Sequence, residues 1–139
     1  MLIRMAGTGE VVALDFWQKA PGTATRDMFQ DRDGKTDPKI ARQSHLSSAV
    51  PGTVSGLALA LKKYGTLPLG ETLAPAIGYA EEGFVVNEKL AADMKAYEAL
   101  LRAHPSTAKI FIKPDGDLYG AGDRLIQKDL AQTLRAIAR

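Results

Sequence analysis

The clearest hydrophobic pattern in the chain lies between Val50 and Gly65. Its apolar residues recur at the three- and four-residue spacing of one helix face: Val54, Leu57, Ala58 and Leu61. Thr53 can cap the first turn, and Gly65 suits a left-handed residue that ends a helix. Gly56 is costly inside a helix, so it indicates that another part of the backbone approaches closely. The pattern therefore predicts a buried helix.

The residues before this helix predict two strands followed by irregular segments. Leu2–Met5 and Val11–Phe16 are short apolar runs separated by a Gly-Thr-Gly segment, which predicts a β-hairpin. Asp15–Phe29 contains Pro-Gly and is expected to be irregular, with a turn at Thr25–Met28. Gln30–Ser48 is mostly polar and predicts a solvated surface loop.

The residues after the helix predict further helices. Because proline disrupts a helix interior, we expect Pro75 to separate two short helices, Pro68–Leu73 and Pro75–Glu82, closed by Gly83. Asn87 is expected to cap a longer helix. That helix would span Lys89–Ala103 and pack inward through one apolar stripe, formed by Leu90, Met94, Tyr97 and Leu101.

Three segments complete the predicted chain. Ser106–Ile112 is expected to form a short helix, and Pro114–Gly122 contains turn residues. Asp129–Ala138 predicts a last helix, with an apolar stripe at Leu130, Leu134 and Ile137. The fold class is therefore α+β. We expect one incomplete segment, with a hairpin and pocket loop over 1–29, a surface loop over 30–49 and a helical region over 50–139.

Composition excludes several kinds of function. The 139 residues include 18 basic and 16 acidic side chains. These are spread along the chain, so no block of charge predicts a nucleic-acid or membrane surface. There is no cysteine, which excludes disulfides and thiol catalysis. The abrupt strand at the start and helix at the end lead us to expect a segment of a larger protein.

Few side chains form a recognisable chemical motif. The phosphate-loop pattern GxxxxGK[ST] and the GxSxG elbow are both absent, so neither nucleotide binding of that kind nor an elbow serine is predicted. His45 and His104 are isolated in the sequence, and we expect surface or helix-end positions for both rather than metal ligation. The acidic residues around Gly34 lack the closing glutamate of a calcium loop and are expected in turns: Asp31, Asp33 and Asp37. No cofactor is predicted.

Two side chains are candidates for ligand binding. Trp17, the only tryptophan, stands where the second predicted strand ends, a place where binding residues are often held. It either lines a binding site or fills the core. Arg26, next to Asp27, can bind a carboxylate, or it can satisfy carbonyls and a neighbouring charge at the predicted turn.

Several motifs, in order across nearly the whole chain, resemble the γ-glutamyltransferase (γ-glutamyltranspeptidase) family. The similar segments are Asp15–Phe16, Ala20–Pro21, Ala24–Phe29, Val50–Gly56, Lys63–Pro68, Glu82–Phe84 and Gly122–Gln127. The resemblance implies an interior segment of the family's large subunit, and so a partial piece of the αββα sandwich of an N-terminal-nucleophile hydrolase. It also implies a periplasmic or secreted location, although no signal peptide is seen in this segment.

The resemblance also implies a mechanism in which this chain has a partner. A precursor cleaves itself, and a threonine freed at the start of the small subunit attacks a γ-glutamyl amide such as that of glutathione. Its released amine can serve as the base. The γ-glutamyl group then passes to water, an amino acid or a peptide. The nucleophile would lie on the small catalytic subunit, so no catalytic residue is expected here and this chain alone should be inactive.

One position departs from the family pattern. The family's DFRE-like motif holds an arginine that binds the α-carboxylate of the γ-glutamyl group, and the matching residue here is Trp17. An aromatic ring suits an acyl chain without that carboxylate, so a glutaryl or cephalosporin acylase on the same scaffold is an alternative. Arg26 is a weaker candidate for the missing anion-binding group. A second alternative is a non-catalytic helical remnant.

Overall fold

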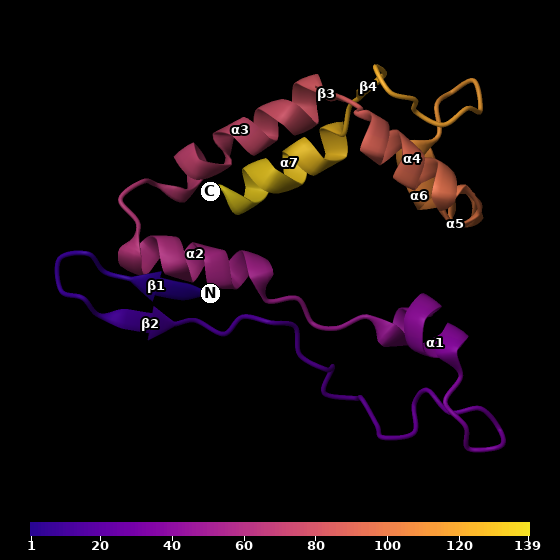
Figure 1. The fold of residues 1–139 in the computed structure, drawn as a ribbon, viewed down its shortest axis with the longest axis horizontal. Helices are drawn as coiled ribbons and strands as arrows, with labels where there is room; N and C mark the ends of the chain where they lie inside the picture. Colours follow the sequence, from indigo (N-terminus) through magenta and orange to yellow (C-terminus); the bar gives the residue numbers. More distant parts are fainter. The chain divides into compact units, whose positions relative to one another are not determined.

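The computed structural model describes residues 1–139 and separates into two compact units, Met1–Thr66 and Leu67–Arg139 (Figure 1). Both units combine helices with short antiparallel strands, in agreement with the predicted α+β class. None of the helices has the length and apolar character needed to cross a membrane.

The first unit begins with the predicted hairpin. Strands β1 (Leu2–Arg4) and β2 (Val11–Ala13) pair antiparallel, with Leu2 opposite Ala13. In the connecting loop, Gly9 has a φ of 74°, a conformation that glycine adopts without steric cost. The second strand ends three residues before the predicted end at Phe16, so the chain is already irregular where it reaches Trp17.

Part of the predicted surface loop over 30–49 is helical, and that prediction is wrong there. Helix α1 spans Pro38–Gln43 and a 3-10 turn spans His45–Ser47. The Asp37 side chain accepts hydrogen bonds from the amides of Lys39 and Ile40, and Pro38 supplies the fixed φ of a first helical position. These helix-start residues favour a helix, although the segment is mostly polar and has no apolar stripe.

Helix α2 (Thr53–Tyr64) confirms the central helix but not its predicted surroundings. Only Gly56 and Ala60 are buried, and the exposed fractions of Val54, Leu57 and Leu59 are 55%, 46% and 42%. A hairpin with two three-residue strands and a six-residue helix provide too little apolar surface to cover this helix. Gly52, not Thr53, is the N-cap.

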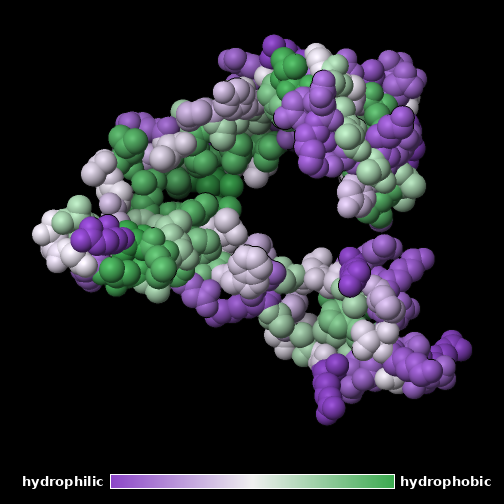
Figure 2. All heavy atoms as spheres, viewed as in Figure 1, coloured by the Kyte–Doolittle hydropathy of each residue, from purple (hydrophilic) through white to green (hydrophobic).

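The prediction for Gly65 is also wrong. Its φ of −85° is an ordinary extended value, and its amide instead closes the helix by donating to the carbonyl of Leu61. In Figure 2, apolar side chains gather over the hairpin and α2 of this unit, while polar side chains cover the segment around α1.

The second unit is built on two packed helices, α3 (Leu69–Glu82) and α7 (Lys128–Ile137). Pro75 lies inside α3, so the predicted division into two helices is wrong. Proline removes one helical hydrogen bond and crowds a carbonyl. Packing of α3 along α7 offsets that loss, and Arg135 forms an ion pair with Glu81 between the two helices. Helix α7 matches the predicted last helix within one residue at each end.

The predicted long helix after Asn87 is divided in two. Asn87 caps α4 (Glu88–Ala96) as expected, since its side chain accepts a hydrogen bond from the Leu90 amide at 2.8 Å. Tyr97, at ψ 15°, breaks the helix, and α5 (Glu98–Ala103) follows. The break leaves Tyr97 63% exposed, so the predicted stripe is wrong at that position.

A small sheet that the sequence did not predict closes this unit. Strands β3 (Phe84–Val85) and β4 (Arg124–Leu125) pair antiparallel, with Phe84 opposite Leu125. Between them in sequence lie α4, α5, the predicted helix α6 (Pro105–Phe111) and the predicted turns. A buried apolar cluster of this unit sits beside the sheet and consists of Val86, Met94 and Leu125.

Candidate functional site

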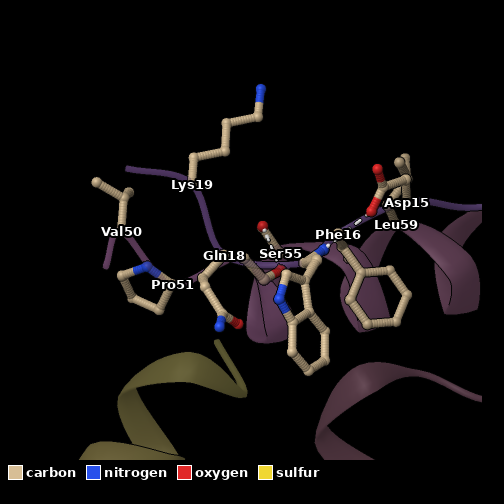
Figure 3. A pocket seen from close by; sticks show the side chains of 11 residues that line it. Asp15, Phe16, Gln18, Lys19, Val50, Pro51, Ser55 and Leu59 are labelled. Carbon is tan, nitrogen blue, oxygen red and sulfur yellow. Dashed lines mark hydrogen bonds between the residues drawn. The ribbon is translucent and has the colours of Figure 1, made fainter. Parts of the chain in front are cut away.

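The first unit contains a cavity of about 480 Å³ beside the start of α2 (Figure 3). One wall is the segment Asp15–Lys19, which follows β2. The other wall runs from Val50 through the first two turns of α2 to Leu59. The two walls correspond to two of the sequence motifs, which lie more than thirty residues apart in the chain.

Main-chain hydrogen bonds hold the two walls together. The Lys19 amide donates to the Val50 carbonyl at 3.2 Å, and the Val50 amide donates to the Lys19 carbonyl at 2.9 Å. At the other end of the segment, the Trp17 amide donates to the Asp15 carboxylate at 3.2 Å. The backbone around Trp17 is therefore fixed on both sides.

A close contact of Phe16 with α2 lies between these hydrogen bonds. A side chain at Gly56 would collide with the base of the Phe16 ring, and a Cβ at Gly52 would lie 2.5 Å from the Phe16 carbonyl oxygen. The expectation of a close approach at Gly56 is thus confirmed, but the expectation that the approaching group is backbone is wrong there. The partner at Gly56 is an aromatic side chain, whereas the main chain approaches at Gly52.

Trp17 is 76% exposed and lines the cavity, so it does not fill the core of this unit. Figure 3 shows that Gln18 and Lys19 extend to opposite sides of the segment. The Ser55 hydroxyl donates to the Gly52 carbonyl at 2.9 Å, which commits it to the helix start. The cavity lining therefore offers an aromatic surface, an amide side chain and the charged side chains of Asp15 and Lys19.

Arg26 does not join this cavity. It is exposed in the predicted turn, outside the residues that line the cavity with Trp17, and it forms no ion pair with Asp27. The lining contains no arginine. The structure therefore does not bring together the two residues that the sequence proposed for substrate binding.

The two histidines and the acidic residues around Gly34 do not form a binding site. His45 and His104 are exposed in different units, and no group of three potential metal ligands occurs in the chain. Asp31 accepts hydrogen bonds from the amides of Asp33 and Lys35, each at 2.9 Å. Its predicted role in a turn is confirmed.

A second cluster of charged groups lies at the β3–β4 junction and was not predicted. Arg124 donates to the carbonyl of Gly83 at 2.8 Å and supports the end of α3, where carbonyls lack helical partners. The Asp123 carboxylate accepts from the Gly120 amide at 2.8 Å and from Lys113 at 3.2 Å.

These two hydrogen bonds lower the pKa of Asp123, and the bond to Asp123 raises the pKa of Lys113. The Gly-Asp-Arg sequence was the only signal for this cluster. All its polar groups bind other parts of the same unit, so its role is structural.

Comparison with known proteins adds information that the geometry does not contain. The family model described as "Gamma-glutamyltranspeptidase" matches residues 1–139. The glutathione hydrolase proenzyme of Escherichia coli (strain K12) is 47% identical over 139 residues, which are 99% of this chain and 24% of that protein. The acylase ACY 1 proenzyme of Pseudomonas sp. (strain V22) is 41% identical over 142 residues, covering 98% of this chain and 25% of that protein.

A solved structure shows a similar fold. The chain matches the crystal structure of Helicobacter pylori gamma-glutamyltranspeptidase with a TM-score of 0.94 and 41% identity. The match covers 99% of this chain and 39% of that chain. The present chain thus spans about a quarter of the length of the curated relatives it matches.

Proposed function

The chain belongs to the gamma-glutamyltranspeptidase family, and from this we propose that it forms part of the large subunit of an enzyme that cleaves γ-glutamyl amides. The names of the relatives support this proposal, since they include glutathione hydrolase proenzymes from several bacteria. Within that enzyme, the chain would form a piece of an αββα sandwich.

The proposed chemistry places the nucleophile on a partner. A small subunit cut from the same precursor begins with threonine, whose hydroxyl attacks the amide carbonyl while the freed α-amine accepts the proton. The amine of the substrate leaves, and the acyl-enzyme passes its acyl group to water or to another amine. The only serine in the cavity lining, Ser55, is committed to the Gly52 carbonyl, in keeping with a nucleophile supplied from elsewhere.

The observation that carries the proposal is the cavity at Trp17. It is formed by two of the motifs that identify the family, and it combines a fixed backbone with an exposed aromatic side chain. Binding sites commonly have this construction, with a mostly apolar lining and few polar groups. We assign Trp17 to the wall of the acyl-binding pocket. Arg26 stays a weaker candidate for binding an anion, because it lies outside this lining.

A second candidate function is an acylase on the same scaffold. It is favoured by the cavity lining, which has Trp17 and no arginine to form a bidentate bond with an α-carboxylate. A glutaryl group has the length of a γ-glutamyl group, keeps its terminal carboxylate and lacks only the α-amino substituent, so the missing arginine by itself favours acyl groups without a carboxylate rather than glutaryl. The 41% identity to an acylase proenzyme agrees with this alternative.

The full-length precursor tests both candidates. Intact-mass analysis should find a second chain that begins with threonine, and kcat/KM should be measured on γ-glutamyl and glutaryl p-nitroanilides. Preference for the γ-glutamyl amide supports the first candidate, and preference for the glutaryl amide supports the second. A precursor that neither cleaves itself nor hydrolyses either amide contradicts both and leaves the non-catalytic remnant.

A further inference from the structure

The contact between Phe16 and α2 leaves no spare volume. At Gly56, an added Cβ would overlap the Cβ and Cγ atoms of Phe16, and no rotation of that side chain can move its Cβ. At Gly52, it would press on the Phe16 carbonyl oxygen and lie 3.4 Å from that of Trp17. A methyl group at either glycine therefore requires the backbone of the Trp17 segment to move.

Within this chain, little else determines where the Trp17 ring lies. With 76% of its surface exposed, the ring lacks the surrounding side chains that would hold it in one position. Its main chain is fixed by the Asp15 carboxylate on one side and by the Lys19–Val50 bridge on the other. Phe16 lies between these two attachments, is only partly exposed, and is the direct neighbour of Trp17.

We propose that Gly56 is a positioning residue for the acyl pocket, because it seats Phe16 against α2 and thereby sets the place of Trp17. This inference rests on the proposed function. A displacement of about 1 Å at a positioned group can change catalytic efficiency by up to about a hundredfold. We therefore expect Gly56→Ala to change the ratio of kcat/KM for 4-aminobutyryl p-nitroanilide, which lacks the α-carboxylate, to that for γ-glutamyl p-nitroanilide by about tenfold, mainly through KM, since the nucleophile is on another subunit.

The test uses the full-length, self-cleaved enzyme. Gly56→Ala is compared with Gly78→Ala, a helical glycine whose added Cβ would meet no atom within 4 Å. The ratio of the two kcat/KM values should change in the first variant and stay constant in the second. The same change should be absent when Gly56→Ala is made in a Trp17→Ala background, because the residue through which it acts is then gone.

Several outcomes would overturn the inference. An unchanged ratio in Gly56→Ala contradicts it, and so does a change that persists without Trp17. If Gly56→Ala fails to cleave itself, Phe16→Leu decides instead, since it alters the same contact without adding an atom and should move the ratio by KM. Failure of the wild-type enzyme to hydrolyse either amide is a separate result, which contradicts the proposed function.

Discussion

The two units of the molecule each use a glycine to bring distant segments into close contact, with different results. In the second unit, Gly83 has a φ of 81°, and an added Cβ would lie 2.8 Å from the Leu125 carbonyl oxygen. In the first unit, an added Cβ at Gly56 would instead overlap the side chain of Phe16. Both contacts join motifs of the family, and neither leaves room for a side chain.

The surroundings of the two glycines differ. Next to Gly83, the exposed fractions of Leu125 and Val86 are 2% and 1%, and the side chain of Arg124 donates to main-chain carbonyls. Next to Phe16, Trp17 is exposed and faces a cavity. The first junction thus directs its groups inward and stabilises the fold, whereas the second leaves one aromatic side chain exposed at a cavity.

Replacing Gly83 should give the largest loss of stability. Gly83→Ala combines a backbone conformation that favours glycine with an overlap on Leu125, at a cost on the order of 3 kcal/mol. Urea denaturation followed by circular dichroism should show a lower midpoint with an unchanged slope. Gly78→Ala is the control and should be neutral or slightly stabilising. Equal midpoints for the two variants would show that the contact at Gly83 has room for a side chain, which contradicts this prediction.

A smaller effect should follow from pH. Because the pKa of Asp123 is lowered in the folded unit, its contribution to stability is present above the ordinary carboxyl pKa and is lost as pH falls through the folded value. The pKa of Lys113 is raised, so its contribution is lost as pH rises through its folded value. The pair therefore stabilises the unit most between about pH 4 and pH 10.

Asp123→Asn tests this pH dependence. It should flatten the acid side of a plot of unfolding free energy against pH, while Asp117→Asn, in the same loop but outside the ion pair, should change it little. An identical acid-side slope in the wild type and in Asp123→Asn would show that this pair does not contribute.

Local signals in the sequence predicted much of the fold. The hairpin, the Asn87 cap and the end of α3 at Gly83 each depend on residues within one turn of the feature. The wrong predictions concern features that depend on residues far away in the sequence. Pro75 stays helical because α3 packs along α7, and β3 and β4 are two-residue strands whose pairing joins positions forty residues apart. A two-residue strand is too short to show an alternation of apolar and polar residues.

The candidate site likewise has features that local sequence signals predicted and features that depend on residues far away in the sequence. The end of a strand indicated Trp17, and an unusual helical glycine indicated a close contact at Gly56. The identity of the partner, Phe16, required the structure, since forty residues separate the two positions. The position of Arg26 outside the cavity also required it.

The most direct test of the account is the substrate preference of the Trp17→Arg enzyme in its full-length, self-cleaved form. A guanidinium that binds the α-carboxylate in a bidentate manner contributes about 1.5–3 kcal/mol, so the ratio of kcat/KM for γ-glutamyl p-nitroanilide to that for 4-aminobutyryl p-nitroanilide, which lacks this carboxylate, should rise about tenfold or more. Tyr79→Arg, at an exposed aromatic residue outside the cavity, is the matched control and should leave the ratio unchanged. A Trp17→Arg enzyme that cleaves itself normally but keeps the wild-type ratio would show that Trp17 does not line the acyl pocket.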